Sequence, residues 1–417
     1  MNSGTRRSPS GPAIPMKTDA TRWSFASTNA RSMRARSRRG SRLACSVVCM
    51  VAPNTPTAST GRAGRCRARP TEARAPARGE ARCRSPRLGI PERVAKRPAM
   101  REAALPAARA RDPARRARRL ARGFGALVGA TSALVVLGAL VRAHGAGLAC
   151  PDWPLCFGEL VPRLDFHVGF EYAHRVLAGS IALAFAGLAV AALRDPGLRA
   201  RVGALLAAAA ALLAVQIVLG GLTVLELLAA WTVTSHLVVG NAFNACLLGV
   251  ALRLRDAAHG LPAAAPRAPG RARVAVALAA AFLALQVLLG GLVSSTYAGM
   301  ACPEWPACNG GRWFPALAGS VGLHLAHRYN AYLLVAVLLG AAAATRGVAR
   351  VGPALRLAAA LGVAQAAVGV ANVRLGIPVE VTGLHSALSA LLVLAVAAAI
   401  TWGYGSARGD AGADGAS

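Results

Sequence analysis

Eight segments of this chain are apolar over lengths that can cross a membrane. A helix needs about 20 apolar residues to span the hydrocarbon core of a bilayer, and 55% of the 417 residues are hydrophobic. The pattern predicts an all-α polytopic membrane protein. Its eight transmembrane helices are expected near residues 123–142, 171–193, 202–223, 230–252, 274–296, 322–345, 355–373 and 381–402.

The basic residues of the connecting loops gather on one side of the predicted membrane. Cytoplasmic loops of membrane proteins carry an excess of Lys and Arg. Eleven arginines lie in the loops near 194–201, 253–273 and 346–356, on the same side as the basic run 115–119, and the opposite loops hold four. Both termini are therefore predicted to be cytoplasmic, or in the matrix if the protein is organellar.

Most of the positive charge precedes the first apolar segment. The formal net charge is +31, and residues 1–122 contribute +24 of it. Residues 1–118 are rich in Arg, Ala, Pro, Ser and Gly without sustained periodicity, so we expect a disordered leader. Three interpretations stay open: translation upstream of a true start at Met100, an Arg-rich organellar transit segment, and a basic arm that contacts anionic lipid or nucleic acid.

The membrane segments form two similar halves. Leu-Gly-x-Leu-Val at 137–141, followed by Cys-Pro-Asp-Trp-Pro-Leu-Cys at 150–156, recurs 152 residues later with Cys-Pro-Glu-Trp-Pro-Ala-Cys in the loop. Four helices separate matching elements, so both copies have one orientation. We expect two tandem four-helix bundles, residues 119–256 and 257–404, and a disordered tail at 405–417.

Four of the eight histidines lie inside apolar segments, at similar depths near the outer ends of every second helix. Two facing imidazoles in a four-helix bundle commonly hold a haem iron, so the chain is predicted to hold two haems, one in each half. A core polar network and a proton relay are the alternatives. A closed zinc site is disfavoured, because no Cys or carboxylate shares a turn with each histidine as such a site requires. The four are His174, His236, His327 and His385.

Two apolar segments open with related polar clusters, and only the first of them contains an acid. Glu171-Tyr-Ala-His-Arg corresponds to His324-Leu-Ala-His-Arg at an offset of 153 residues. Polar groups inside a membrane helix are costly and usually functional. Arg175 and Arg328 suit either haem propionates or interfacial snorkelling. Glu171, present only in the first half, marks that half as the place for acid chemistry.

Each half also carries a cysteine pair in the loop after its first helix. Cys150/Cys156 and Cys302/Cys308 lie on the predicted outer, oxidising side, where disulfides persist. Five intervening residues with two prolines can curl enough to close a bridge. A plain loop staple and a redox role are both open.

Taken together, these features resemble haem A synthase, a family of membrane enzymes of bacteria and mitochondria. The likeness covers roughly residues 123–402 and rests on the motif at 171–175, the Cys-Pro-x-Trp-Pro-x-Cys loops, the four histidines and the duplication. It implies oxidation of the C8 methyl of haem O to the formyl group of haem A by successive hydroxylations, the gem-diol losing water. The chain offers no flavin or nicotinamide motif, so an outside reductant is required.

The resemblance implies different roles for the two halves. In the second half, His327 and His385 would bind the iron of a resident haem b that passes electrons, with Arg328 near its propionates. The pair Cys302/Cys308 is not universal in the family, and no role carries over to His324.

In the first half, the resemblance places the substrate haem between His174 and His236, with Arg175 beside it. Glu171 would be the catalytic acid or a charge stabiliser. The Cys150/Cys156 pair matches the family's first-loop pair, which is expected to assist electron or substrate handling.

Two other functions stay open at this point. A dihaem cytochrome b-like quinol oxidoreductase would keep both haems permanently, and a haem or small-molecule transporter would use the duplicated bundle alone. The expected partners are haem O, a haem O synthase upstream, an unidentified electron donor and membrane lipid, without nucleic acid, and a homo-oligomer stays open. The expected location is the bacterial inner (cytoplasmic) membrane, or the mitochondrial inner membrane in a eukaryote.

Overall fold

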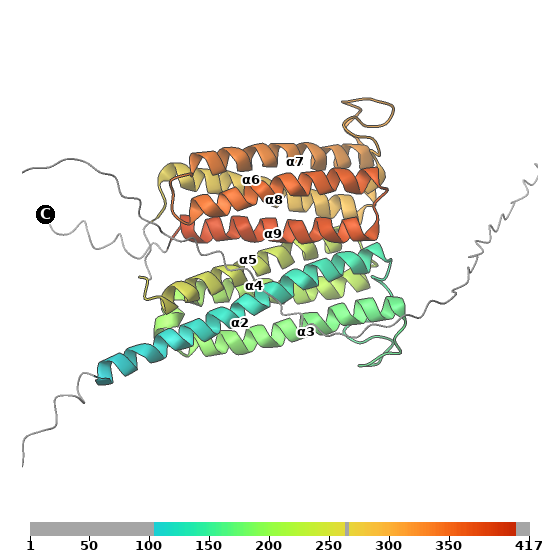
Figure 1. The fold of residues 1–417 in the computed structure, drawn as a ribbon. Helices are drawn as coiled ribbons and strands as arrows, with labels where there is room; N and C mark the ends of the chain where they lie inside the picture. Colours follow the sequence, from blue (N-terminus) through green and yellow to red (C-terminus); the bar gives the residue numbers. More distant parts are fainter. Residues whose placement is uncertain (1–103, 263–266, 406–417) are drawn as a thin grey trace, which may run out of the picture. The chain divides into compact units, whose positions relative to one another are not determined.

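The structure is a computed structural model that describes residues 104–262 and 267–405 (Figure 1). No strand occurs within these ranges, and eight helices are long and apolar enough to cross a membrane, which confirms the predicted fold class. The elements are α2 (Ala104–Ala143), α3 (Phe166–Leu193), α4 (Pro196–Leu225), α5 (Ala230–Ala258), α6 (Gly270–Ser295), the short 3₁₀ helix η1 (Ala298–Met300), α7 (Gly319–Ala344), α8 (Val351–Arg374) and α9 (Val379–Gly403).

The first helix begins earlier than the sequence indicated. We expected a disordered leader up to residue 118, but residues 104–118 belong to α2, and this part of the prediction is wrong. Ala and Arg are strong helix formers, and Ala117 and Leu120 are buried against the bundle, so helix continues beyond the apolar run. Residues 1–103 of the expected leader and 406–417 of the expected tail lie outside the described residues.

Short polar signals fix the turn between α3 and α4. The Asp195 carboxylate caps α4 by accepting hydrogen bonds from the backbone N–H groups of Gly197 and Leu198. Pro196 takes the first helical position, where its missing N–H costs nothing. Asp165 caps α3 in the same way through Val168.

Buried apolar residues form two main clusters, one in each half of the chain. The first is built from α2 to α5 and contains Phe124, Phe185 and Phe243, whose rings meet edge to face with centroids 6.4 and 5.5 Å apart. The second is built from α6 to α9. These clusters support the predicted division into halves at residue 256. The division, the tandem repeat and the cytoplasmic location of both termini remain predictions.

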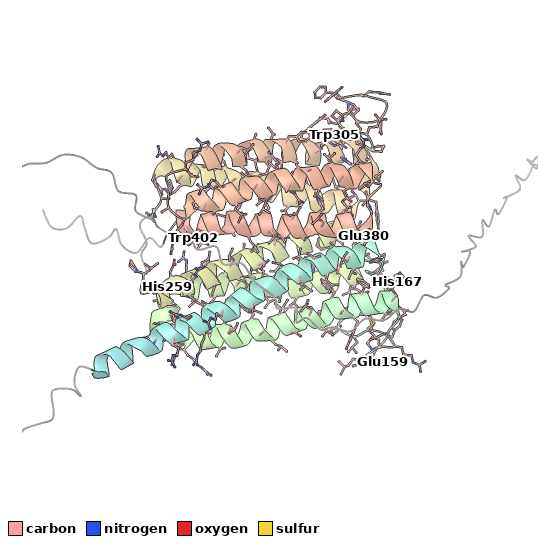
Figure 2. All side chains as sticks on the ribbon, viewed as in Figure 1. Glu159, His167, His259, Trp305, Glu380 and Trp402 are labelled. Atoms are coloured by element: carbon pink, nitrogen blue, oxygen red, sulfur yellow. A yellow bond between two sulfur atoms is a disulfide. The ribbon has the colours of Figure 1, made fainter. Side chains whose placement is uncertain are left out.

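Two disulfide-closed loops lie at the same end of the helices, which we call the disulfide end. Figure 2 shows Glu159 of the first loop and Trp305 of the second at this end, and His259 and Trp402 at the opposite end. At the disulfide end, Arg142 of α2 donates to the Ser294 side chain of α6 at 2.8 Å, which ties the halves together.

At the opposite end a bidentate ion pair joins the halves. Arg350 contacts both carboxylate oxygens of Asp256 at 2.8 and 2.9 Å. The same guanidinium lies 5.6 Å from the ring centroid of Trp402. The interaction with Asp256 raises the pKa of Arg350 further above its ordinary value, so the pair stays charged.

Candidate functional site: four histidines and two disulfide loops

The four intramembrane histidines occupy matching places in their helices. His174 and His327 each lie eight residues after the first residue of α3 and α7. His236 and His385 each lie six residues after the first residue of α5 and α9. At about 1.5 Å per residue, all four are within about two turns of the disulfide end, which is the depth that the sequence indicated.

The histidines are grouped in pairs by half. His236 acts electrostatically on His174, and His385 acts on His327, so the two imidazoles of each half are near one another. All four residues are only half-buried in the bundle. Each half therefore has two neighbouring imidazoles, and none of the four histidines is fully buried.

A glycine on the preceding helix faces each histidine ring. A Cβ atom built on any of these glycines would come within 3.0–3.2 Å of the imidazole, which is closer than carbon atoms normally pack. The glycines let each ring lie directly against a helix backbone. The pairs are Gly138 with His174, Gly220 with His236, Gly290 with His327 and Gly369 with His385.

Protein groups leave much of the imidazole bonding capacity unused. The Nδ1 atoms of His236 and His385 are buried and have no hydrogen-bond partner. Within the described residues, no hydrogen bond reaches the His174 ring. Buried polar atoms without partners are rare in native proteins and require an explanation, such as a ligand absent from the structure.

A glutamine orients the ring of His327. The side-chain NH₂ group of Gln286 lies 3.2 and 3.3 Å from the two ring nitrogens, and its carbonyl oxygen accepts from Asn330 at 2.7 Å. In the first half, the amide nitrogen of Gln216 lies 3.1 Å from His236 Nε2. Gln286 was missed in the sequence because Leu134 occupies the corresponding position of the first half, so the repeat does not mark it.

The close-packed cores stop short of the histidines. In each of α3, α5, α7 and α9, the first residue of the buried cluster comes seven residues after the histidine, about 10 Å along the helix axis. In each of these helices, the main apolar cluster therefore begins on the side of the histidine that faces away from the disulfide end. These first cluster residues are Ile181, Phe243, Leu334 and Leu392.

This arrangement fits haem better than a bare metal ion. Across the described residues, no group of three or more His, Cys, Asp and Glu side chains could hold a metal ion. A porphyrin supplies four nitrogen ligands itself, so two imidazoles suffice as axial ligands. The paired rings, the glycines that face them and the unpartnered nitrogens agree with such a group in each half.

In the first half, Arg175 binds the disulfide loop. Its guanidinium donates to the carbonyl oxygens of Cys150, Asp152 and Leu155 at 3.3, 2.8 and 2.6 Å. It also pairs with Glu171 at 2.6 Å. The other carboxylate oxygen of Glu171 accepts from the Cys150 N–H at 2.9 Å, and only 5% of this residue is exposed. Both oxygens of the predicted catalytic acid are thus engaged with the loop and its arginine.

The second half repeats this contact set with one substitution. Arg328 donates to the carbonyl oxygens of Cys302, Glu304 and Ala307 at 2.9, 3.1 and 3.1 Å. Its fourth contact is His324 Nε2 at 3.2 Å, in the place that Glu171 takes in the first half. We use the term loop latch for one such contact set. It consists of the arginine, the side chain four residues before it (Glu171 or His324) and the three loop carbonyl oxygens that the arginine contacts. Haem propionates were the predicted partners of the arginines, and that role stays a prediction.

Both predicted cysteine pairs form disulfides. The sulfur atoms of Cys150 and Cys156 are 2.05 Å apart, and those of Cys302 and Cys308 are 2.07 Å apart. One carboxylate orders each loop further. Hydrogen bonds from the Gly158 and Phe157 N–H groups hold the pKa of Asp152 below its usual value, and Gly311 and Gly310 do the same for Glu304.

The two loop tryptophans pack differently. Trp153 lies against Gly221 of α4, where a Cβ would come within 3.2 Å of the indole. Trp305 instead donates to the Tyr332 hydroxyl at 3.0 Å. Beside the first loop, a cavity of about 190 Å³ opens next to Arg175 and Tyr172 of α3 and to Cys156 of the disulfide. The two halves are therefore alike in their latches and unlike in the packing of their loop tryptophans.

Known proteins match this chain over the whole helical region. The profile of the cytochrome oxidase assembly protein family (COX15-CtaA) matches residues 124–397. A relative named heme A synthase in Shewanella oneidensis is 27% identical over 306 residues, which is 63% of this chain and 90% of the relative. Relatives of the same name are 28% identical in Rhizorhabdus wittichii (66% and 90% covered) and 33% identical in Symbiobacterium thermophilum (49% and 68% covered).

The family match covers all four histidines, both latches and both disulfides. The eight helices and the bacterial relatives fit a multi-pass protein of the inner membrane. Because the family profile spans well over half of the sequence, the chain belongs to the COX15-CtaA family of cytochrome oxidase assembly proteins.

Proposed function

We propose that the chain oxidises haem O to haem A in the inner membrane. The observation that carries the proposal is the set of four histidines, each set against a glycine and grouped in one pair per half. The relatives that bear the name heme A synthase support it, since the alignments with two of them span 90% of the relative's length.

In this proposal the substrate binds in the first half and a haem b stays bound in the second. Haem O would lie between His174 and His236, and haem b between His327 and His385. Haem b supplies one-electron transfer when bound. The position of Glu171 supports this assignment. A reaction on the C8 methyl group needs a reactive or charge-stabilising side chain, which a half that only binds haem does not need, and only the first half has this acid.

Glu171 acts in this scheme by charge rather than as a free proton donor. Its carboxylate is buried and both oxygens are already engaged, one by Arg175 and one by the Cys150 N–H. A fixed carboxylate in a water-poor site stabilises positive charge that develops nearby without having to reorganise. The same contacts make the Cys150–Cys156 loop a cover over the reacting end of the first half.

The reaction as proposed turns a methyl group into a formyl group by successive hydroxylations, the gem-diol then losing water. With dioxygen as the oxidant, each hydroxylation inserts one oxygen atom into a C–H bond and reduces the other to water, with two electrons and two protons from an outside donor. A haem O synthase must act upstream to supply the substrate. The chain's own residues would bind the two haems, orient the C8 edge toward Glu171 and limit the access of water.

Co-expression with a haem O synthase, followed by analysis of the extracted haems, tests the proposal. Haem A is expected only when both proteins are present. If haem O accumulates unchanged while the purified protein carries two stable haems b, the chain is a dihaem electron-transfer protein instead.

Single histidine variants test the division between the halves. His327→Ala or His385→Ala should remove the absorbance of the resident haem b. His259→Ala is the matched control, since this exposed residue sits at the opposite end and its ring contacts the Arg255 carbonyl oxygen. An unchanged spectrum in both of the first two variants would reject the assignment.

A further inference from the structure

The two loop latches differ in charge although they share their geometry. In the first half, the Arg175 cation meets the Glu171 anion at 2.6 Å, so that latch is neutral overall. In the second half, the fourth partner of the Arg328 guanidinium is an imidazole. Within the described parts of the chain, no carboxylate lies within ion-pair distance of Arg328, whose remaining partners are the three loop carbonyls.

The hydrogen bonds of His324 require a neutral ring. Its Nδ1 lies 3.0 Å from the Ala298 carbonyl oxygen, which can only accept, so Nδ1 carries the proton. Its Nε2 lies 3.2 Å from a guanidinium nitrogen, which can only donate, so Nε2 is unprotonated. Both polar atoms of this ring are satisfied, and only 4% of the residue is exposed.

The second latch therefore holds a buried positive charge next to the second haem site. Arg328 is 8% exposed and directly follows His327 in α7. A charge in this setting is screened by solvent much less than one on the surface. Other acids do not remove this difference in charge between the two latches. Asp152 and Glu304 occupy matching positions in the two loops, so each half has one of them. Glu380 at the start of α9 is exposed to solvent.

We propose that His324 is a positioning residue that holds Arg328 as an uncompensated cation beside the resident haem and thereby raises the reduction potential of that haem. A nearby positive charge stabilises the reduced form, which carries one electron more. The inference rests on the proposed function, since it assigns haem b to the second half. It explains why the acid is kept in one half and replaced in the other.

Redox titration of the purified protein with its haem b tests this. His324→Glu should lower the midpoint potential, since it recreates the neutral pair of the first half. His324→Gln should leave the potential close to that of the unaltered protein, because an amide also offers one donor and one acceptor without charge. Arg312→Gln is the control for charge: it changes the net charge by the same amount at an exposed loop position and should shift the potential much less.

A potential that is unchanged in His324→Glu, or shifted equally by Arg312→Gln, overturns the proposal. If His324→Glu does not retain haem, Arg328→Lys and Arg328→Gln replace it as a pair. The Lys variant should keep the higher potential and the Gln variant should lose it, and equal potentials reject the idea. Absence of haem b from the unaltered protein would instead contradict the proposed function, so the two failures are distinguishable.

Discussion

Replacing Gly290 by alanine should weaken the binding of the resident haem without weakening the fold. The new Cβ would lie 3.0 Å from Cε1 of His327 and 3.6 Å from Nδ1. Comfortable carbon contacts are about 3.5–4.0 Å, so the ring must move by about half an ångström or α6 and α7 must separate. Overpacking of this kind costs about 1–3 kcal/mol. If that cost falls on the ligand position of His327, haem affinity drops about 5- to 150-fold.

The same substitution has an opposite effect on the helix itself. Alanine is favoured over glycine inside a helix by about 1 kcal/mol, so the thermal unfolding of the haem-free protein should not shift downward. The assay is haem transfer from the purified protein to an acceptor such as apomyoglobin, followed by absorbance, beside a thermal melt of the haem-free form.

Gly340→Ala provides the matched control within the same half. Gly340 lies in α7, and nothing comes within 4 Å of a Cβ built there. It should gain helix stability and keep the haem. If Gly290→Ala holds haem as tightly as Gly340→Ala, the glycine does not fix the position of His327, and the reasoning from close approach is wrong.

Three further outcomes follow from the contacts described above. Glu171→Gln should reduce haem A formation about 10²-fold, the scale for loss of a preorganised charge contact, while haem b content in the same preparation stays unchanged. Arg350→Gln should lower stability by only about 0.5 kcal/mol, because its pair with Asp256 is half exposed and screened, and the loss should vanish in melts at high salt. A chain that begins at Met100 should insert and make haem A normally, since α2 starts at Ala104; failure to accumulate in membranes would show that residues 1–99 are needed.

The number and rough position of the helices could be predicted because membrane helices are specified locally. Each apolar run reports its own span, and every one of the eight appears in the structure. The error at the start of α2 has a local cause too. The segment before residue 119 consists mostly of Arg and Ala and has few large apolar residues, so its composition suggested disorder. Both residue types nevertheless favour helix, and Leu120 and Phe124 anchor the segment in the bundle.

The latches were out of reach of the same reasoning. Arg175 contacts carbonyls that lie 20–25 positions earlier in the chain, and carbonyl oxygens belong to every residue type, so no pattern marks them. The sequence therefore indicated haem propionates or interfacial snorkelling for both arginines. The role of His324 was invisible for a related reason, because its place opposite Arg328 follows from comparison with the contacts of Glu171.

Haem binding can explain the contacts that both halves share. The contacts that differ should then reflect the different fates of the two haems, since one is a substrate and the other stays bound. The glycine–histidine contacts and the arginine latches occur in both halves. In α4, the glycine that faces His236 is followed by Gly221, and the half-exposed Trp153 packs against Gly221. In α8, the residue that corresponds to Gly221 is Val370. A substrate has to enter and leave, but a resident haem has to stay. In the proposed scheme, the small Gly221 and the indole that packs on it therefore belong in the first half, and the bulkier valine and the Trp305–Tyr332 hydrogen bond belong in the second.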